Sequence, residues 1–396
     1  MSISSEVKNT LSRSSWIRKM FEEGNRLKEV HGPENVFDFT LGNPDLPPPR
    51  QFTEKLQALV KNPPADLHRY MPNAGWPQAR RSIARSLQQR TGLPYRGEHL
   101  VMTVGAGGAL NVVFKALLDP EDEVIILCPY FVEYLFYIAN HRGKTVTVET
   151  HPDFSIDLEA VEKSITPRTR AILINSPNNP TGKVYGKEEL EALAEVLTQG
   201  STRHGHPIYL ISDEPYRKIL YDDVICPEIP PLYPNTILVT SHSKDLGLAG
   251  ERIGYLAVTP GASDDSELIE AFTFCNRTLG FVNAPSLFQL AVAECQDVAV
   301  DITPYRERRD LLLHHLRGLG LEVETPRGAF YLFPRSPIPD EREFVRQLMQ
   351  ERVLVVPGRG FGRSGYFRLS YAVPSPIIER SLSAWERATA RKRKVQ

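Results

Sequence analysis

Cysteine is scarce in this chain, with four among 396 residues and no paired spacing. Such a count supplies neither a disulfide framework nor a zinc site, and we expect no bound metal. Long hydrophobic runs are also lacking, because Pro129 and Glu133 interrupt the most apolar region, 124–139. Residues 1–10 are polar and do not resemble a signal peptide. We therefore expect a cytoplasmic protein that has no membrane partner.

An excess of charge of one sign is missing as well. Lys and Arg number 47 against 48 Asp and Glu, so the net charge is -1. No broad field attracts nucleic acid, and we expect no nucleic-acid partner. The one basic run, Arg391-Lys392-Arg393-Lys394, is interpreted as the solvated end of the last helix.

What is present is a regular alternation of strand and helix patterns. Helical patterns such as 109–118 and 187–197 lie between short β-branched runs, which is typical of an α/β fold with a mostly parallel sheet covered by helices. The predicted strands are Val101–Val104, Val124–Leu127, Thr145–Val148, Ala171–Ile174, Ile208–Ile211, Ile237–Thr240 and Ile253–Val258.

The pattern changes after about Ala293. A charged helix over 305–316, a helix near 343–350 and a final helix are interleaved with short segments at 329–333, 352–357 and 366–372. This pattern predicts a second, smaller α+β domain. The Pro-rich stretch 43–49 cannot be regular structure and is expected to carry an N-terminal helix across to the large domain.

Ligands of parallel sheets bind beyond the carboxyl ends of the strands, so the residues that follow each predicted strand are the candidates for ligand contacts. Small residues in Gly105-Ala106-Gly107-Gly108 allow backbone amides and a helix N-terminus to surround a phosphate, although a plain tight turn fits equally well. In Ser176-Pro177-Asn178-Asn179-Pro180-Thr181-Gly182 two prolines stiffen a turn that aims an amide out of the sheet; a simple Asn-Pro turn is the alternative.

Two further strand ends carry charged side chains. Asp213 follows a buried run, as either a crevice carboxylate or a helix N-cap. Lys244, among small residues after Ile237–Thr240, fits a Schiff-base amine whose pKa burial would lower, or else a solvated loop lysine.

The spacing of Ser241 and Lys244 also matches that of penicillin-recognising serine enzymes. Those enzymes need a Lys-Thr-Gly strand and a Ser-Asp-Asn element. The chain has Lys144-Thr145-Val146 and Ser212-Asp213-Glu214 instead, so we reject this class. A non-catalytic ligand-binding module on the same fold stays open and needs an activity assay.

Taken together in order and spacing, the motifs are much more specific than each alone. From Phe39 to Ala372 the sequence resembles the class I/II (fold-type I) aminotransferases of the aspartate-aminotransferase superfamily, which use pyridoxal 5'-phosphate (PLP). The matching stretches are Gly42-Asn43-Pro44-Asp45, Tyr70-Met71-Pro72-Asn73-Ala74-Gly75, Asn178-Asn179-Pro180-Thr181-Gly182, Asp213-Glu214-Pro215-Tyr216, Ser241-His242-Ser243-Lys244, Arg252-Ile253-Gly254 and Arg368-Leu369-Ser370.

This resemblance implies a large PLP domain (49–292), a small C-terminal domain (293–396), and an N-terminal segment (1–48) that packs with the small domain. It also implies a homodimer whose active sites lie at the interface. Amino-acid and 2-oxo-acid substrates would exchange an amino group through a Schiff base on the lysine. A PLP-dependent lyase of the same fold, such as a C–S β-lyase, is the alternative.

The resemblance also implies a role for each matching residue. Lys244 resembles the Schiff-base lysine and general base, and Asp213 the partner of the pyridinium nitrogen. Asn179 and Tyr216 resemble the pair that bonds the ring's phenolic oxygen, and Phe131 the aromatic that stacks on the ring. The phosphate would meet backbone amides and basic or hydroxyl side chains, namely those of Ala106, Gly107, Gly108, Ser241, Ser243, Arg252 and, from the partner subunit, Tyr70. Arg368 resembles the clamp on the substrate α-carboxylate, and Gly42 a backbone contact beside the substrate.

One departure bears on specificity. Some aspartate enzymes of this family carry a lysine in the phosphate turn that contacts the distal carboxylate of the substrate, whereas this chain has Gly107 there. Arg277 lies one residue away from where other members place a distal-carboxylate arginine. We therefore expect either that Arg277 recognises dicarboxylates or that it is a solvated surface residue.

Overall fold

A seven-stranded sheet forms the centre of the computed structural model, which describes residues 3–4, 7–8 and 16–390. The basic run at 391–394 and most of residues 1–10 lie outside the described residues. The strand order is β2-β8-β7-β6-β5-β3-β4, and β8 alone runs antiparallel to its neighbours. The strands are β2 (Leu100–Thr103), β3 (Glu123–Cys128), β4 (Lys144–Glu149), β5 (Thr169–Asn175), β6 (Tyr209–Asp213), β7 (Thr236–Ser241) and β8 (Gly254–Val258).

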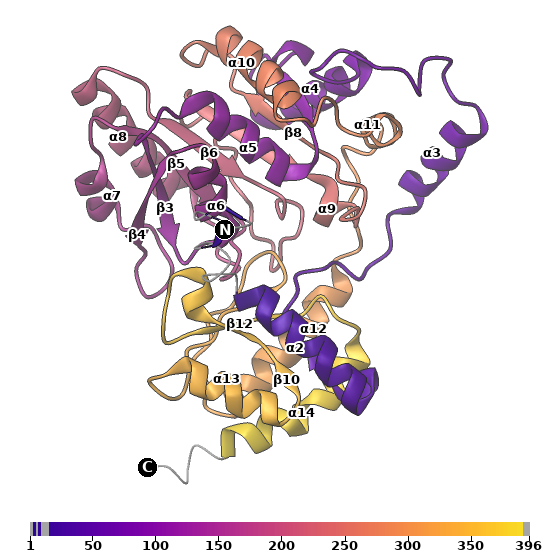
Figure 1. The fold of residues 1–396 in the computed structure, drawn as a ribbon, viewed down its shortest axis with the longest axis vertical. Coiled ribbons are helices and arrows are strands. Elements are labelled where there is room, and N and C mark those ends of the chain that lie inside the picture. The colour runs from indigo at the N-terminus through magenta and orange to yellow at the C-terminus, as the bar shows by residue number, and fades with distance from the viewer. Residues whose placement is uncertain (1–2, 5–6, 9–15, 391–396) are drawn as a thin grey trace.

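Successive side chains of these strands point to opposite faces, and each face has its own helical cover (Figure 1). On one face Ile126 and Leu173 pack against α5 (Gly105–Leu117), α6 (Glu133–Asn140) and α10 (Asp265–Thr278). On the other face Ile125 and Ile172 pack against α7 (Leu158–Ser164) and α8 (Lys187–His204). At the β2–β8 end of that second face lie α3 (Arg50–Lys61), α4 (Pro77–Thr91) and α11 (Ser286–Ala293). This burial on both faces explains why the strands other than the largely exposed edge strand β4 read as continuous apolar runs. The predicted α/β class is confirmed.

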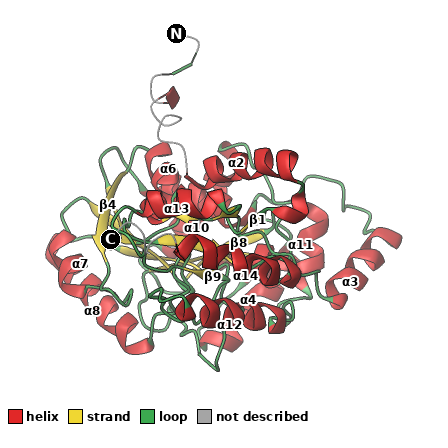
Figure 2. Ribbon diagram, turned by 90° about the horizontal axis from the view of Figure 1, so that it is seen from below, coloured by secondary structure: helices red, strands yellow, loops and turns green. Residues whose placement is uncertain are grey.

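Two small sheets and four helices form a separate layer below the large sheet in Figure 1. They are β1 (Phe37–Asp38) with β10 (Val353–Leu354), the sheet β11 (Val356–Pro357), β12 (Phe367–Ser370) and β9 (Tyr331–Leu332), and helices α2 (Trp16–His31), α12 (Thr303–Gly318), α13 (Glu341–Gln350) and α14 (Ser375–Ala390). Figure 2 views this layer from below. The predicted smaller α+β part is confirmed.

Both ends of the chain contribute to the core of this layer. β1 pairs in parallel with β10, and Phe39 lies 6.2 Å, centroid to centroid, from the ring of Trp385. Asp45, in the Pro-rich stretch, accepts two hydrogen bonds of 2.9 Å from Arg308 on α12. The N-terminal segment is therefore held against the C-terminal helices before the chain enters the large sheet.

In the described part of the chain, no helix is long and apolar enough to cross a membrane. The same residues contain no group of three or more His, Cys, Asp or Glu side chains arranged to hold a metal ion. The four cysteines are free and buried.

Candidate active site

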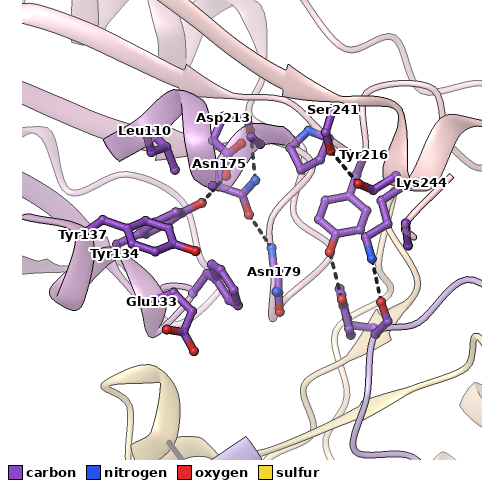
Figure 3. A pocket seen from close by; sticks show the side chains of 18 of the residues that line it. Leu110, Glu133, Tyr134, Tyr137, Asn175, Asn179, Asp213, Tyr216, Ser241 and Lys244 are labelled. Carbon is purple, nitrogen blue, oxygen red and sulfur yellow. Dashed lines mark hydrogen bonds between the residues drawn. The ribbon is translucent and has the colours of Figure 1, made fainter. Parts of the chain in front are cut away.

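A cavity of about 380 Å³ opens at the carboxyl ends of the parallel strands, where the small sheets meet the large one (Figure 3). Twelve of the residues that the sequence singled out line it: Gly42, Ala106, Gly107, Phe131, Asn179, Asp213, Tyr216, Ser241, Ser243, Lys244, Arg252 and Arg368. They come from segments more than 300 residues apart in the chain. This edge of the sheet is where the strand topology predicts a ligand.

Asp213 is the last residue of β6, and its carboxylate is buried at the floor of the cavity. Tyr134 on α6 donates a hydrogen bond of 2.6 Å to Oδ2, whereas the buried Oδ1 has no partner among the residues that the structure describes. Burial raises the pKa of the Asp213 carboxyl to about 7; the bond from Tyr134 opposes the rise and the nearby Glu214 adds to it. A buried carboxylate oxygen without a partner is costly, so this atom is suited to a cationic or N–H group of a ligand.

Lys244 lies on the short helix α9 (His242–Asp245), directly after β7, and its amine enters the cavity. Nζ donates a hydrogen bond of 2.7 Å to the carbonyl of Gly42 and lies 5.5 Å from the centroid of the Phe330 ring. Burial lowers the pKa of the Lys244 amine to about 8, and the positive charges of Arg252 and Arg368 act in the same direction. A neutral, nucleophilic amine is therefore within reach at physiological pH.

Gly42 has no space for a side chain. A Cβ at this position would lie 1.8 Å from the hydroxyl oxygen of Tyr331. That hydroxyl is 2.8 Å from the hydroxyl of Tyr216, so the two phenols and the Gly42 backbone meet beside Lys244. Figure 3 shows Tyr216 next to Lys244.

Arg368, from β12, is the most deeply buried cation of the cavity, with 2% of its surface exposed. Its guanidinium donates to the carbonyl of Thr40 and, over 3.1 Å, to Oδ1 of Asn179, and it lies 4.7 Å from the Tyr331 ring centroid. Among the described residues its Nε has no hydrogen-bond partner, and burial lowers the pKa of the guanidinium. No carboxylate in the described part of the chain forms an ion pair with it, so an anionic ligand group would satisfy an otherwise unpaired charge.

The other end of the cavity is built for an anion. The N-terminus of α5 brings Ala106 and Gly107 to the surface, and Arg252 approaches the same turn. A Cβ on Gly105, which has a φ of +68°, would come 3.1 Å from Nη2 of Arg252. Ser241 donates to the Ser243 hydroxyl over 3.1 Å alongside. Unpaired helix amides, two hydroxyls and a guanidinium together can hold a phosphate.

Three other residues that the sequence singled out are not among those that line the cavity. Gly108 is buried within α5, facing Val104 and Phe281. Tyr70 is 92% exposed on the outside of the molecule. Arg277, in the last turn of α10, is exposed, and its guanidinium lies 5.5 Å from the centroid of the Phe274 ring.

Other lining residues were not anticipated from the sequence: Leu41, Leu110, Glu133, Tyr134, Tyr137, Asn175, Pro215, Ala249 and Tyr331. Asn175 ends β5, so the strand-end rule could have found it. Its side chain bonds both the Asp213 carbonyl and the Asn179 amide. Tyr134 and Tyr331 had no comparable signal, because an aromatic residue in an apolar stretch normally indicates core.

Comparison with known proteins supports the same interpretation. Residues 34–384 match the family described as aminotransferase class I and II. An aspartate/prephenate aminotransferase of Thermus thermophilus is 36% identical over 370 residues, which cover 89% of this chain and 90% of that protein. A probable aspartate aminotransferase of Methanocaldococcus jannaschii is 33% identical and covers 96% of this chain and 98% of its own length.

Solved structures agree with these sequence similarities. An aminotransferase from Eubacterium rectale superposes with a TM-score of 0.95 at 38% identity, covering 99% of both chains. The Thermus thermophilus aspartate aminotransferase with maleate superposes with a TM-score of 0.86 at 32% identity, covering 98% of this chain and 100% of that one.

The fold and the cavity thus define an α/β enzyme that works with PLP. The donors present fit that cofactor: an amine for its aldehyde, an unpaired carboxylate oxygen for its ring nitrogen, and an anion site for its phosphate. More narrowly, the chain belongs to the class I and II aminotransferase family. It is a PLP-dependent aminotransferase.

Proposed function

We propose that this aminotransferase binds PLP covalently through Lys244 and moves an amino group from an L-amino acid to a 2-oxo acid at the cavity described above. The observation that carries the proposal is the pairing of two perturbed groups in one cavity. The Lys244 amine has a pKa lowered to about 8, and Asp213 presents a buried, unpaired oxygen. Such pairs are typical of catalytic sites.

The cofactor, when bound, supplies a sink for the electrons that are released when a substrate Cα–H bond breaks. Asp213 would hold a proton on its ring nitrogen. Tyr216 and Asn179 would bond its phenolic oxygen, and Phe131 would stack on the ring. The phosphate would be held by backbone amides of Ala106, Gly107 and Gly108 together with Ser241, Ser243 and Arg252.

Arg368 and Lys244 would act on the substrate itself. The unpaired Nε of Arg368 and its lack of a protein carboxylate favour a bidentate contact with the substrate α-carboxylate. Gly42 would lie beside the substrate with its carbonyl. Lys244 would accept the Cα proton of the substrate as a general base, since its pKa of about 8 is near physiological pH.

Borohydride reduction followed by peptide mass spectrometry tests the central assignment. We expect the purified protein to be yellow and the reduced cofactor to be found on Lys244. Lys218 is a useful internal comparison, because it is half-buried but contacts backbone carbonyls outside this cavity. An adduct on Lys218, on any other lysine, or on none would contradict the proposal.

We propose a homodimer in which Tyr70 reaches the partner's phosphate site. Tyr70 is the most exposed of the large hydrophobic side chains in the described part of the chain. The segment that follows Tyr70 is hydrogen-bonded to the surface that carries Arg277. Asn276 donates to the carbonyl of Asn73, and Asn283 donates to the carbonyl of Pro72. Exposed aromatic side chains on a fixed surface support a subunit contact.

Two further proposals concern the chain as a whole. We propose that it divides into an N-terminal segment (1–48), a large PLP domain (49–292) and a small domain (293–396), supported by the separate cores of the two layers. We propose the cytoplasm as its compartment, supported by four cysteines that are all free. Limited proteolysis and cell fractionation test the two.

A further inference from the structure

Glu133 is a charge in the cavity to which neither the cofactor nor the α-carboxylate gives a role. The other charged lining groups each have a proposed partner: Lys244 and Asp213 at the ring, Arg252 at the phosphate and Arg368 at the substrate carboxylate. Within the described residues the Glu133 carboxylate forms no hydrogen bond or ion pair, although the residue is half-buried in the wall of the cavity. Burial accordingly raises the pKa of the Glu133 carboxyl.

Tyr137 lies beside Glu133. The two residues are four apart on α6, and residues at that spacing share one face of a helix. Figure 3 shows both side chains on the side of the cavity away from Lys244. Tyr134, which follows Glu133 on α6, turns instead toward Asp213.

The Tyr137 hydroxyl occupies the space beside the phosphate turn. A Cβ added to Gly107 would lie 3.0 Å from it. The position from which some relatives extend a lysine to a distal carboxylate therefore has no side chain here, and a phenol fills the adjoining space. Among the described residues of one subunit, no cation replaces that lysine, because Arg277 does not line the cavity of its own chain.

We propose that Glu133 and Tyr137 form the subsite for the substrate side chain, and that they select amino acids whose side chain ends in a cation over dicarboxylic ones. This inference rests on the proposed function, because it takes Arg368 as the α-carboxylate site. An ammonium or guanidinium group would pair with Glu133 and could donate to the Tyr137 oxygen. A distal carboxylate would face Glu133 and be repelled.

The test compares three amino donors of similar length, L-ornithine, L-norvaline and L-glutamate, with the PLP-loaded enzyme. The rate at which each converts the bound cofactor in single turnover gives kcat/KM without an acceptor. We expect wild type to prefer ornithine to glutamate, and Glu133→Gln to lower kcat/KM for ornithine by about tenfold, which corresponds to about 1.4 kcal/mol. In the same variant, kcat/KM for norvaline should change by less than about twofold, and kcat/KM for glutamate should rise.

Two control variants separate side-chain selection from general damage. Glu159→Gln removes a carboxylate that is 77% exposed on α7, and its donor preferences should equal those of wild type. Tyr137→Phe keeps the ring and removes the hydroxyl, so it should lower kcat/KM for ornithine more than kcat/KM for norvaline. Binding without turnover, measured by calorimetry on PLP-loaded Lys244→Ala, should show the same order of donors and the same loss in the Glu133→Gln background.

The possible outcomes separate a failure of the subsite proposal from a failure of the proposed function. If norvaline reacts and Glu133→Gln changes all donors equally, or if wild type prefers glutamate, the subsite proposal is wrong while the proposed function stands. If none of the three donors converts the cofactor in wild type, the proposed function fails and the subsite proposal fails with it.

Discussion

Asp213 makes the stability of the cofactor-free enzyme depend on pH. Its carboxyl has a pKa of about 7 in the fold against an ordinary value of 3.8. The stability linked to this proton is therefore fully present below about pH 4 and is lost as the pH rises through about 7. The loss could reach about 4 kcal/mol, from three pKa units of about 1.4 kcal/mol each. Urea unfolding of the apoenzyme at pH 5 and pH 8 measures it.

The isosteric variant is the control for this effect. Apo Asp213→Asn should unfold with much less difference between the two pH values, because its amide does not titrate. If the pH dependence of this variant equals that of wild type, the loss of stability does not arise from Asp213.

The same variant tests the role of Asp213 in turnover. PLP-loaded Asp213→Asn should keep its cofactor but lose about 10²–10³ in kcat, since an amide no longer holds the ring nitrogen protonated. Absorbance of the bound cofactor verifies loading before the rate is measured. Near-normal kcat in a loaded, folded variant would remove Asp213 from the mechanism.

Gly42 is a position where one added methyl group should destabilise the fold. Its Cβ would overlap the Tyr331 hydroxyl at 1.8 Å, displacing the acceptor of Lys244 or the Tyr216–Tyr331 pair. We expect Gly42→Ala to lower the free energy of unfolding by about 1–3 kcal/mol and to weaken PLP binding. Gly318→Ala on α12, where nothing lies within 4 Å of the new Cβ, should do neither. Equal effects of the two variants would contradict this account.

At the level of elements, the pair Asp45–Arg308 joins the Pro-rich stretch to α12. Both hydrogen bonds are 2.9 Å long, and the arginine side chain is only 9% exposed. Asp45→Asn removes the negative charge and leaves this guanidinium with a weaker hydrogen-bond acceptor. The free energy of unfolding, measured with urea, should fall by about 1–3 kcal/mol. Glu322→Gln breaks an exposed pair with Arg335 and should change stability by less than about 0.5 kcal/mol. A similar small change in both would show that the N-terminal segment does not depend on Asp45.

Elements also differ in how far local sequence predicts them. Each of the seven strands of the large sheet overlaps a predicted run. In all but the edge strand β4, burial on both faces leaves little room for polar residues, whereas β4 is largely exposed. The stretch 352–357 reads as one segment, yet it forms two strands. β10 pairs with β1 near the N-terminus, whereas β11 pairs with β12. Such short strands are defined by their distant partners rather than by their own composition.

At the scale of the whole molecule, the homodimer gives the most demanding prediction. Tyr70→Phe should weaken PLP binding without separating the subunits. It removes only the hydroxyl that would reach the phosphate of PLP in the partner subunit. Mixing Tyr70→Phe with Lys244→Ala subunits should restore about one good site per heterodimer, as a two-fold interface requires. Sedimentation and the activity of the mixture measure this, and a fully active wild-type monomer would contradict it.

Arg277 belongs to this scale as well. Its exposed position is compatible with a surface residue and with one that contacts a second subunit. If it serves dicarboxylates across an interface, Arg277→Ala should lower kcat/KM for aspartate and glutamate and spare alanine. Equal small losses for all donors would show that it is a solvated surface residue.

The sequence by itself determined the fold class, the order along the chain of the strands of the large sheet, and twelve of the residues that line the cavity. It could do so because strand ends in a parallel sheet converge on one edge, and because Lys244, Asp213 and Arg368 each stand in a local motif. Only the tertiary structure decided that Tyr134 bonds Asp213 and that Tyr331 lies beside Gly42 and Tyr216. It also decided that Glu133 faces the same cavity with no partner among the described residues. These contacts join helices, strands and loops that lie far apart in the chain. Whether a tyrosine or a glutamate is core, surface or site depends on what the folded chain places opposite it.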